Sequence, residues 1–175
     1  MTTATTTTDR ATVDLSLETP IGTLVLRGDD RTLLQLFLPS QRPRARRSTG
    51  GIPAPLSVAA RQLDEYFAGS RRTFSLDFEL EGTDFQRRVW LALADIPYGE
   101  TVSYGELART IGHPNAYRAV GSANGANPLA IILPCHRVVA GDGSLGGYGG
   151  GLPTKQALLE LERAVAAGKG GARGR

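Results

Sequence analysis

The pattern of apolar residues changes near residue 83, and this change constrains the fold more than any other feature of the chain. Before it, three short stretches rich in Leu, Val and Thr are separated by Pro and Gly turns, at residues 12–18, 22–28 and 31–38. Such stretches predict strands of a small antiparallel sheet. After it, apolar residues recur at helical spacing. With 175 residues, the chain can form one domain or two small packed lobes, of α+β class.

The first part also contains one helix and one loop. Residues 55–68 have the apolar spacing of a helix that stops near Gly69, and residues 73–80 form a short run that could rejoin the sheet. Residues 39–53, which lie between the third strand and this helix, carry Arg42, Arg44, Arg46 and Arg47. Two interpretations of this segment stay open, a solvated flexible loop or a contact with nucleic acid.

The second part is predicted to hold four helices. Thr83 and Ser103 are suitable N-caps for the first two, and Glu106 would complete a capping box with Ser103. A third helix is expected over about 116–125 and a last one over 153–167. The second and third helices are joined by a short turn, and Arg118 is exposed near the start of the third, so the pair resembles a helix-turn-helix. Helical hairpins that never meet DNA share this pattern.

Cysteine content and charge exclude several classes of protein. One cysteine rules out an internal disulfide framework and a multi-cysteine zinc site, which fits a reducing cytoplasm. We see no secretory signal and no apolar run long enough to span a membrane. The net charge is +3, and the basic excess lies in residues 85–175, with ten Lys and Arg against six Asp and Glu. A phosphate backbone is a compatible partner.

The single cysteine, Cys135, follows an apolar run that we expect to be a buried strand and precedes His136 and Arg137. A buried thiol is often only core filler. A thiol between Pro134 and a histidine is also a candidate nucleophile, because a nearby imidazole lowers the thiol pKa. On an extended segment, neighbouring side chains point in opposite directions, so a turn or a water would have to couple the two.

Residues 141–151 contain seven glycines and Tyr148. A backbone without side chains can approach a ligand closely and offer its N–H groups. The spacing matches neither a Walker loop nor a dinucleotide fingerprint. A mobile surface loop is the alternative interpretation.

Five ordered motifs together resemble the O6-alkylguanine-DNA alkyltransferase family, the methylated-DNA–protein-cysteine methyltransferases. They are Ser-Tyr-Gly-Glu-Leu-Ala at 103–108, Arg-Ala-Val-Gly at 118–121, Asn-Pro at 127–128, Pro-Cys-His-Arg-Val at 134–138 and Tyr-Gly-Gly-Gly-Leu at 148–152. The resemblance implies a ribonuclease-H-like N-terminal lobe over 1–81, with residues 1–10 disordered. It further implies a DNA-binding and alkyl-acceptor domain over 82–167 and a disordered tail over 168–175.

The resemblance also implies roles for individual residues. Cys135 would accept the alkyl group from O6 of a damaged guanine, or from O4 of thymine. His136 would deprotonate the thiol through a water, and Glu162 would orient the imidazole. Asn127 would support the turn before the acceptor segment.

Further implied roles concern DNA. The target nucleotide would be rotated out of the duplex. Arg118 would fill the gap it leaves, Ala119 would allow close approach, and Tyr104, next to Ser103, would press on the target phosphate. Tyr148, Gly149 and Gly150 would wall the guanine pocket. Some relatives have a serine where this chain has Gly149.

The expected partner is double-stranded DNA containing O6-alkylguanine, bound by a monomer or cooperatively, without cofactor, metal or membrane. Each molecule would act once, because an S-alkylcysteine is a thioether. Three alternatives remain: a protein that recognises damage without repairing it, a helix-turn-helix regulator with an incidental thiol, and a cysteine hydrolase. Known relatives of the first kind lack the acceptor cysteine. The regulator would bind undamaged DNA selectively by sequence, without covalent change. The hydrolase would leave the Asn-Pro bend, the helix with Arg118 and the glycine-rich loop without a common purpose.

Overall fold

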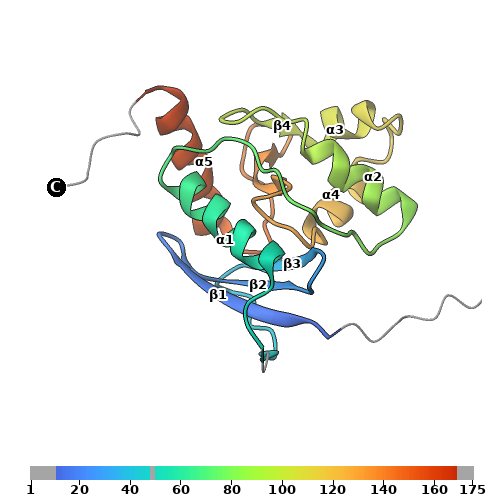
Figure 1. Ribbon diagram of the computed structural model, residues 1–175. Coiled ribbons are helices and arrows are strands. Elements are labelled where there is room, and N and C mark those ends of the chain that lie inside the picture. The colour runs from blue at the N-terminus through green and yellow to red at the C-terminus, as the bar shows by residue number, and fades with distance from the viewer. Residues whose placement is uncertain (1–10, 48–49, 169–175) are drawn as a thin grey trace, which may run out of the picture.

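The computed structural model describes residues 11–47 and 50–168 and has the predicted α+β architecture, with a sheet-bearing lobe packed against a helical lobe (Figure 1). The predictions of disorder concerned residues 1–10 and 168–175, which, apart from Gly168, lie outside the described residues. In the first lobe, the strands β1 (Val13–Thr19), β2 (Gly22–Gly28) and β3 (Leu33–Phe37) form an antiparallel sheet in that order. The helix α1 (Ala54–Phe67) packs on this sheet.

The turn residues of the sequence set the register of this sheet. Gly22 has φ +112°, a conformation that other residues rarely adopt, and the Thr19 hydroxyl donates to its carbonyl over 2.6 Å. The tight turn pairs Leu17 with Leu24 and Leu15 with Leu26. Both β2 leucines are fully buried, as period-two alternation requires for the covered face of a sheet.

The strand predicted over residues 73–80 is wrong. The segment makes one isolated bridge, between Leu33 and Phe78, and is otherwise irregular. At Ser75, the backbone forms hydrogen bonds with a side chain and not with a neighbouring strand. The buried Gln62 of α1 donates to the carbonyl of Ser75 over 2.8 Å and accepts from its N–H over 2.9 Å. These two bonds use both backbone groups that a strand would need at that residue.

The helical lobe begins with the two predicted caps. Thr83 and Ser103 both form complete capping boxes, with Gln86 and Glu106, at the starts of α2 (Asp84–Leu93) and α3 (Tyr104–Thr110). The helix α4 (Tyr117–Gly125) packs against both, and the indole of Trp90 donates to the Ala123 carbonyl over 2.7 Å. The pair α3 and α4 is the expected helix-turn-helix. The last helix, α5, spans Leu152–Ala166.

The apolar segment before Cys135 is buried as predicted but is not a strand. Ile131 has φ +72°, and the Leu133 N–H donates to the Leu129 carbonyl, so the segment curls into turns. Asn127 holds the curl, because its amide donates to the Leu133 carbonyl over 2.7 Å and accepts from the Leu129 N–H over 3.0 Å. A short 3-10 helix, η1 (Cys135–Arg137), follows directly. The strand β5 (Val138–Val139) then pairs in parallel with β4 (Val102–Ser103).

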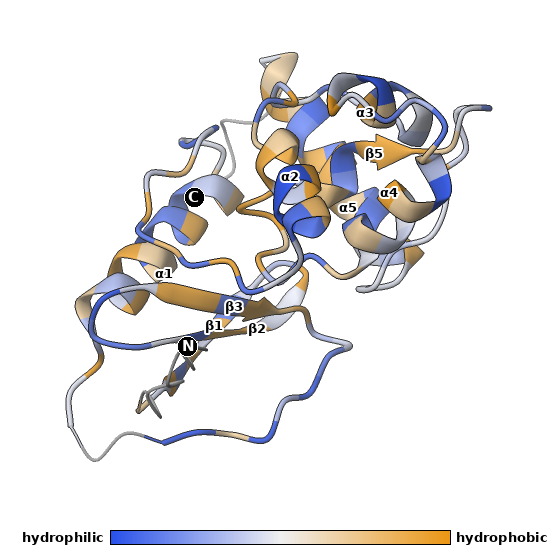
Figure 2. Cartoon of the chain, turned by 90° about the vertical axis from the view of Figure 1, so that its right-hand side faces the viewer, coloured by the Kyte–Doolittle hydropathy of each residue, from blue (hydrophilic) through white to orange (hydrophobic). Residues whose placement is uncertain are grey.

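The two lobes share one hydrophobic core. Apolar segments of both face the contact between them, while hydrophilic segments lie largely outside (Figure 2). The Leu36 N–H of β3 donates to the Pro128 carbonyl over 2.8 Å, which links the sheet to the acceptor segment. Within the described residues, no helix is long and apolar enough to cross a membrane, and no cluster of His, Cys, Asp and Glu could hold a metal ion.

Candidate active site

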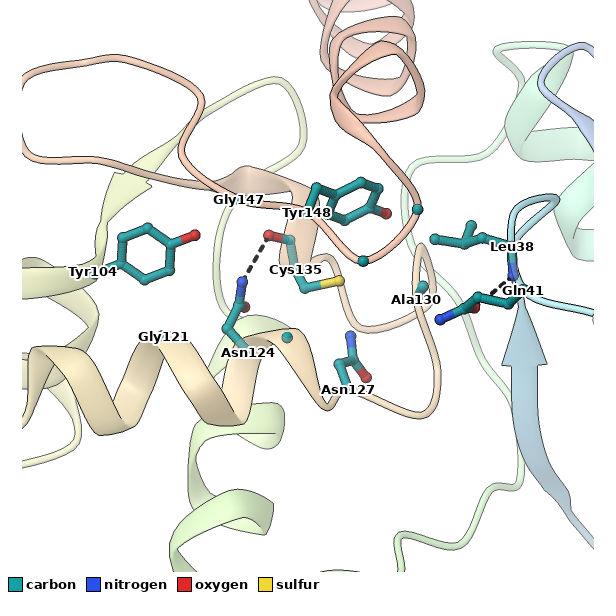
Figure 3. Close-up of a pocket in the computed structure, with 13 residues that line it drawn as sticks. Leu38, Gln41, Tyr104, Gly121, Asn124, Asn127, Ala130, Cys135, Gly147 and Tyr148 are labelled. Carbon is teal, nitrogen blue, oxygen red and sulfur yellow. Dashed lines mark hydrogen bonds between the residues drawn. The ribbon is translucent and has the colours of Figure 1, made fainter.

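Cys135 lies at a cavity of about 390 Å³ between the lobes (Figure 3). Its walls come from four segments that are distant in sequence: the turn after β3, the helix-turn-helix, the curl around Asn127 and the glycine-rich loop. The lining residues are Leu38, Gln41, Tyr104, Gly121, Asn124, Gly125, Asn127, Ala130, Cys135, Gly147, Tyr148, Gly149 and Gly150. The volume suits a flat aromatic ligand enclosed by apolar surface and a few polar groups.

The thiol is covered rather than activated at rest. Cys135 is only 4% exposed. Burial raises the pKa of the thiol, and interactions with Asn127 and Tyr148 offset this in part. The expectation that a neighbouring imidazole lowers the pKa is therefore wrong for the resting protein. A thiolate would have to form during the reaction, with a base present to take the proton.

His136 is a suitable base. The imidazole is completely buried, and its Nε2 lies 2.7 Å from Oε1 of Glu162. Burial lowers the pKa of His136, so the ring is neutral near pH 7. Because the carboxylate accepts from Nε2–H, the lone pair belongs to Nδ1. That atom is buried without a hydrogen-bond partner among the described residues.

Glu162 on α5 is a buried carboxylate with partners from both lobes. Burial acts to raise its pKa, but bonds from His136 and Arg137 outweigh this and hold the pKa at about 2. Arg137 donates from Nε and Nη2, both over 2.9 Å, and the Tyr66 hydroxyl donates over 2.7 Å. The Gly99 N–H adds a bond of 3.2 Å. The carboxylate is thus fixed and ionised.

Arg137 and Tyr66 were not predicted as site residues. Arg137 stands inside the Pro-Cys-His-Arg motif, and a charged residue in an otherwise buried run was a signal of a buried ion pair. Tyr66 carried no such signal, because an aromatic residue at a helical core position is normal packing. Its contact with a residue 96 positions later depends on how the lobes dock.

The glycine-rich loop is held by a buried lysine that the sequence pattern does not indicate. Lys155 of α5 is fully buried, and its ammonium donates to the carbonyls of Val138 (2.6 Å), Leu145 and Gly147 (3.3 Å). Its Nζ lies 5.9 Å from the centre of the Tyr148 ring. Together these contacts fix the loop over the cavity.

Tyr148, Gly149 and Gly150, the residues predicted to form a pocket, all line the cavity at Cys135. Tyr148 covers the sulfur in Figure 3, and burial together with the adjacent thiol raises the pKa of its phenol. A Cβ at Gly150 would lie 2.4 Å from Cδ1 of Leu38 and 3.1 Å from the Tyr148 ring, so a larger residue there would have to displace the Leu38 side chain. A Cβ at Gly149 would meet only ordinary contacts, 3.8 Å from the Gly125 carbonyl and 3.9 Å from Nε2 of Gln41. Gln41 and Leu38 were not predicted to line the pocket.

The predicted DNA-binding residues divide into two groups. Tyr104 is half-buried in the cavity wall, where burial and the charge of a Cys135 thiolate raise its pKa, and Ser103 serves as the helix cap. Arg118 and Ala119 lie outside the cavity on the exposed first turn of α4. The Arg118 guanidinium lies 5.8 Å from the centre of the exposed Tyr117 ring. An exposed cation on the second helix of a helix-turn-helix is well placed for DNA.

Asn127 and Asn124 brace the acceptor segment from α4 and the turn after it. Asn127 makes the two backbone bonds described above. Asn124 was not predicted, and its side-chain amide donates to the Cys135 carbonyl over 3.3 Å (Figure 3). Both amides therefore fix the backbone on either side of the nucleophile.

Comparisons with known proteins identify the family of the chain. Residues 84–164 match the family described as "6-O-methylguanine DNA methyltransferase, DNA binding domain", and residues 14–80 match its "ribonuclease-like domain". The methylated-DNA–protein-cysteine methyltransferase of Mycobacterium tuberculosis is 52% identical over 153 residues, which cover 86% of this chain and 92% of that protein. That of Methanosarcina barkeri is 49% identical and covers 83% and 94%.

A solved structure matches at the same level. The crystal structure of Mycobacterium tuberculosis OGT in complex with DNA superposes with a TM-score of 0.79 at 51% identity and covers 86% of this chain and 92% of that one. The matches to both family domains and to relatives over nearly their whole length indicate one family, and the buried Cys135, His136 and Glu162 are consistent with it. The chain is therefore a member of the O6-methylguanine-DNA methyltransferase family, with both of its domains.

Proposed function

We propose that this chain repairs alkylated DNA by direct reversal, with Cys135 as the acceptor and His136 and Glu162 as its activating pair. The observation that carries this proposal is a buried cysteine that lines the cavity and is followed in the chain by a buried histidine fixed by an ionised glutamate. The hydrolase and regulator alternatives do not account for this cavity beside a helix-turn-helix.

The transfer is an in-line displacement at the O6-alkyl carbon. The His136 lone pair on Nδ1 takes the thiol proton through a bridging water, and Glu162 stabilises the imidazolium that forms. The Sγ–C bond forms as the C–O6 bond breaks, and the electron pair of that bond goes to the guanine oxygen. Tyr148 can then donate its proton or a hydrogen bond to the leaving base, because burial keeps the phenol protonated.

Reaching the thiol requires a base that has left the duplex, at a cost of a few kcal/mol. In this proposal, Arg118 fills the gap in the stack, Ala119 allows the helix to approach, and Tyr104 helps to rotate the target nucleotide. Phosphate contacts dominate affinity, so binding weakens with salt and depends little on sequence. A thiol that must stay reduced suits the cytoplasm, where we place the protein.

The test is intact-protein mass spectrometry after incubation with a molar excess of duplex containing one O6-methylguanine. We expect one methyl group in place of one hydrogen on each molecule, mapped to Cys135, and no second transfer. Cys135→Ser and an undamaged duplex are the matched controls. An unchanged mass with retained DNA binding would contradict the transferase and support a protein that only recognises damage.

A further inference from the structure

The turn after β3 places one polar side chain of the N-terminal lobe at the cavity. Residues Leu38 to Gln41 form a tight turn, in which the Gln41 N–H donates to the Leu38 carbonyl over 2.8 Å. The Ser40 hydroxyl lies 3.5 Å from the Gly149 carbonyl, so this turn rests on the glycine-rich loop. The N-terminal lobe therefore contributes directly to the wall of the substrate site.

The orientation of the Gln41 amide is fixed by its own turn. Its Oε1 accepts from the Leu38 N–H over 2.9 Å. A backbone N–H can only donate, so the atom bound to it must be the oxygen, and the NH₂ group must occupy the other end of the amide. Figure 3 shows this nitrogen extending toward the cavity. Its distance from the Cβ position of Gly149 is 3.9 Å.

We propose that Gln41 is a specificity-determining residue of the alkyl transfer, and that its Nε2 donates a hydrogen bond to the acceptor edge of the extruded guanine. The proposal rests on the proposed function. Gly149 and Gly150 beside it lack side chains, so on this side of the cavity they can offer only backbone groups. The Gln41 amide adds a side-chain donor from the opposite lobe to the Tyr148 hydroxyl of the glycine-rich loop.

This donor gains importance as the reaction proceeds. When the C–O6 bond breaks, its electron pair leaves negative charge on the guanine oxygen, and a donor fixed beforehand stabilises that charge without reorganisation. The Leu38 bond provides this fixation. Gln41 thus favours a leaving group that can accept a hydrogen bond. Guanine O6 can do so, whereas an alkylated site without an acceptor edge cannot.

The decisive variant is Gln41→Glu, because its carboxylate can still accept from the Leu38 N–H but presents no donor to the cavity. We expect its second-order rate constant for methyl transfer from O6-methylguanine duplex to fall at least tenfold, and the same loss with the free base O6-benzylguanine. The free base carries no phosphate, so an effect of charge on DNA binding cannot cause that loss. Gln35→Glu on β3 makes the same charge change away from the cavity and should react at the wild-type rate.

A second variant tests the missing donor directly. The rate constant for methyl transfer should fall about tenfold in Gln41→Ala. Adding Gly149→Ser should bring it back to within about threefold of the wild-type value, because a serine has room there and its hydroxyl lies on the same side of the cavity. Wild-type rates for Gln41→Glu, or no recovery in the double variant while its thermal midpoint is unchanged, would overturn the proposal. A wild-type protein that transfers no methyl group would instead refute the proposed function.

Discussion

At the scale of single residues, the resting state of the nucleophile differs from the state that would react. Cys135 is covered and protonated in the resting protein, and the base proposed to activate it is a neutral His136 held by Glu162. We therefore expect the acceptor to react fastest with an electrophile that the cavity holds in line with the sulfur.

This arrangement predicts slow labelling of the free protein by small electrophiles. Burial raises the thiol pKa, so the rate of iodoacetamide labelling should rise with pH through a midpoint above the ordinary value of 9.0. Because the chain has one cysteine, the total label measured by mass spectrometry reports this residue alone. Asn127→Ala, which removes an interaction that lowers the pKa, should move the midpoint further up. A midpoint below 8 in the wild type would contradict a covered, protonated thiol.

The sequence motifs indicated the residues proposed to react, but not the residues that hold them in place. Cys135 and His136 are adjacent in one motif, and Glu162 was accessible only through the resemblance. Lys155 and Gln41 could not be found from the pattern, because a lysine on a helix and a glutamine in a polar loop are ordinarily solvated. Their roles depend on carbonyls and a cavity that exist only once distant segments meet.

At the scale of elements, local signals decided most of the fold. Both capping boxes and the turn at Gly22 act within a few residues, and the elements they limit formed as expected. The two failures, the segments 73–80 and 129–134, have one cause. In each, a side chain, that of Gln62 or Asn127, satisfies backbone groups that the apolar pattern had assigned to a strand.

The contact between α5 and the glycine-rich loop gives a prediction at this scale. Lys155→Met keeps the apolar stem but leaves three carbonyls without their donor, which should cost about 3 kcal/mol of unfolding free energy. The loop should also lose its fixed position, so the methyl-transfer rate should fall more than tenfold. Urea unfolding and single-turnover kinetics measure the two effects. Lys155→Arg tests whether charge alone is sufficient; unchanged kinetics in Lys155→Met would show that the loop is held by other contacts.

At the scale of the whole molecule, Glu162 joins the lobes, since Tyr66 of the first lobe and Arg137 of the second both donate to it. A carboxyl with a folded pKa of about 2 and an ordinary value of 4.5 stabilises the fold above pH 4.5, by about 3 kcal/mol, and this contribution is lost as the pH falls toward 2. The His136 pKa is lowered from 6.5 in the folded chain, so protonation favours unfolding below that pH.

Stability should therefore decrease in two stages on acidification, first below about pH 6.5 and again below about pH 4.5. Urea midpoints at pH 7.5, 5.5, 4 and 3 test this. His136→Gln should remove the first stage, whereas His113→Gln, which changes the only other histidine, at an exposed position, should retain it. A flat profile between pH 7.5 and 5.5 in the wild type would contradict a buried neutral imidazole.

Burial of the thiol affects how long each molecule stays able to repair DNA. Each molecule accepts one alkyl group, so a sulfur lost to peroxide or to a free alkylating agent is a repair event that never takes place. Oxidants and small electrophiles both attack the exposed thiolate, and the resting protein presents neither exposure nor negative charge at Cys135. The fold thus preserves the number of molecules with an unmodified Cys135, and that number sets how many further lesions the cell can repair.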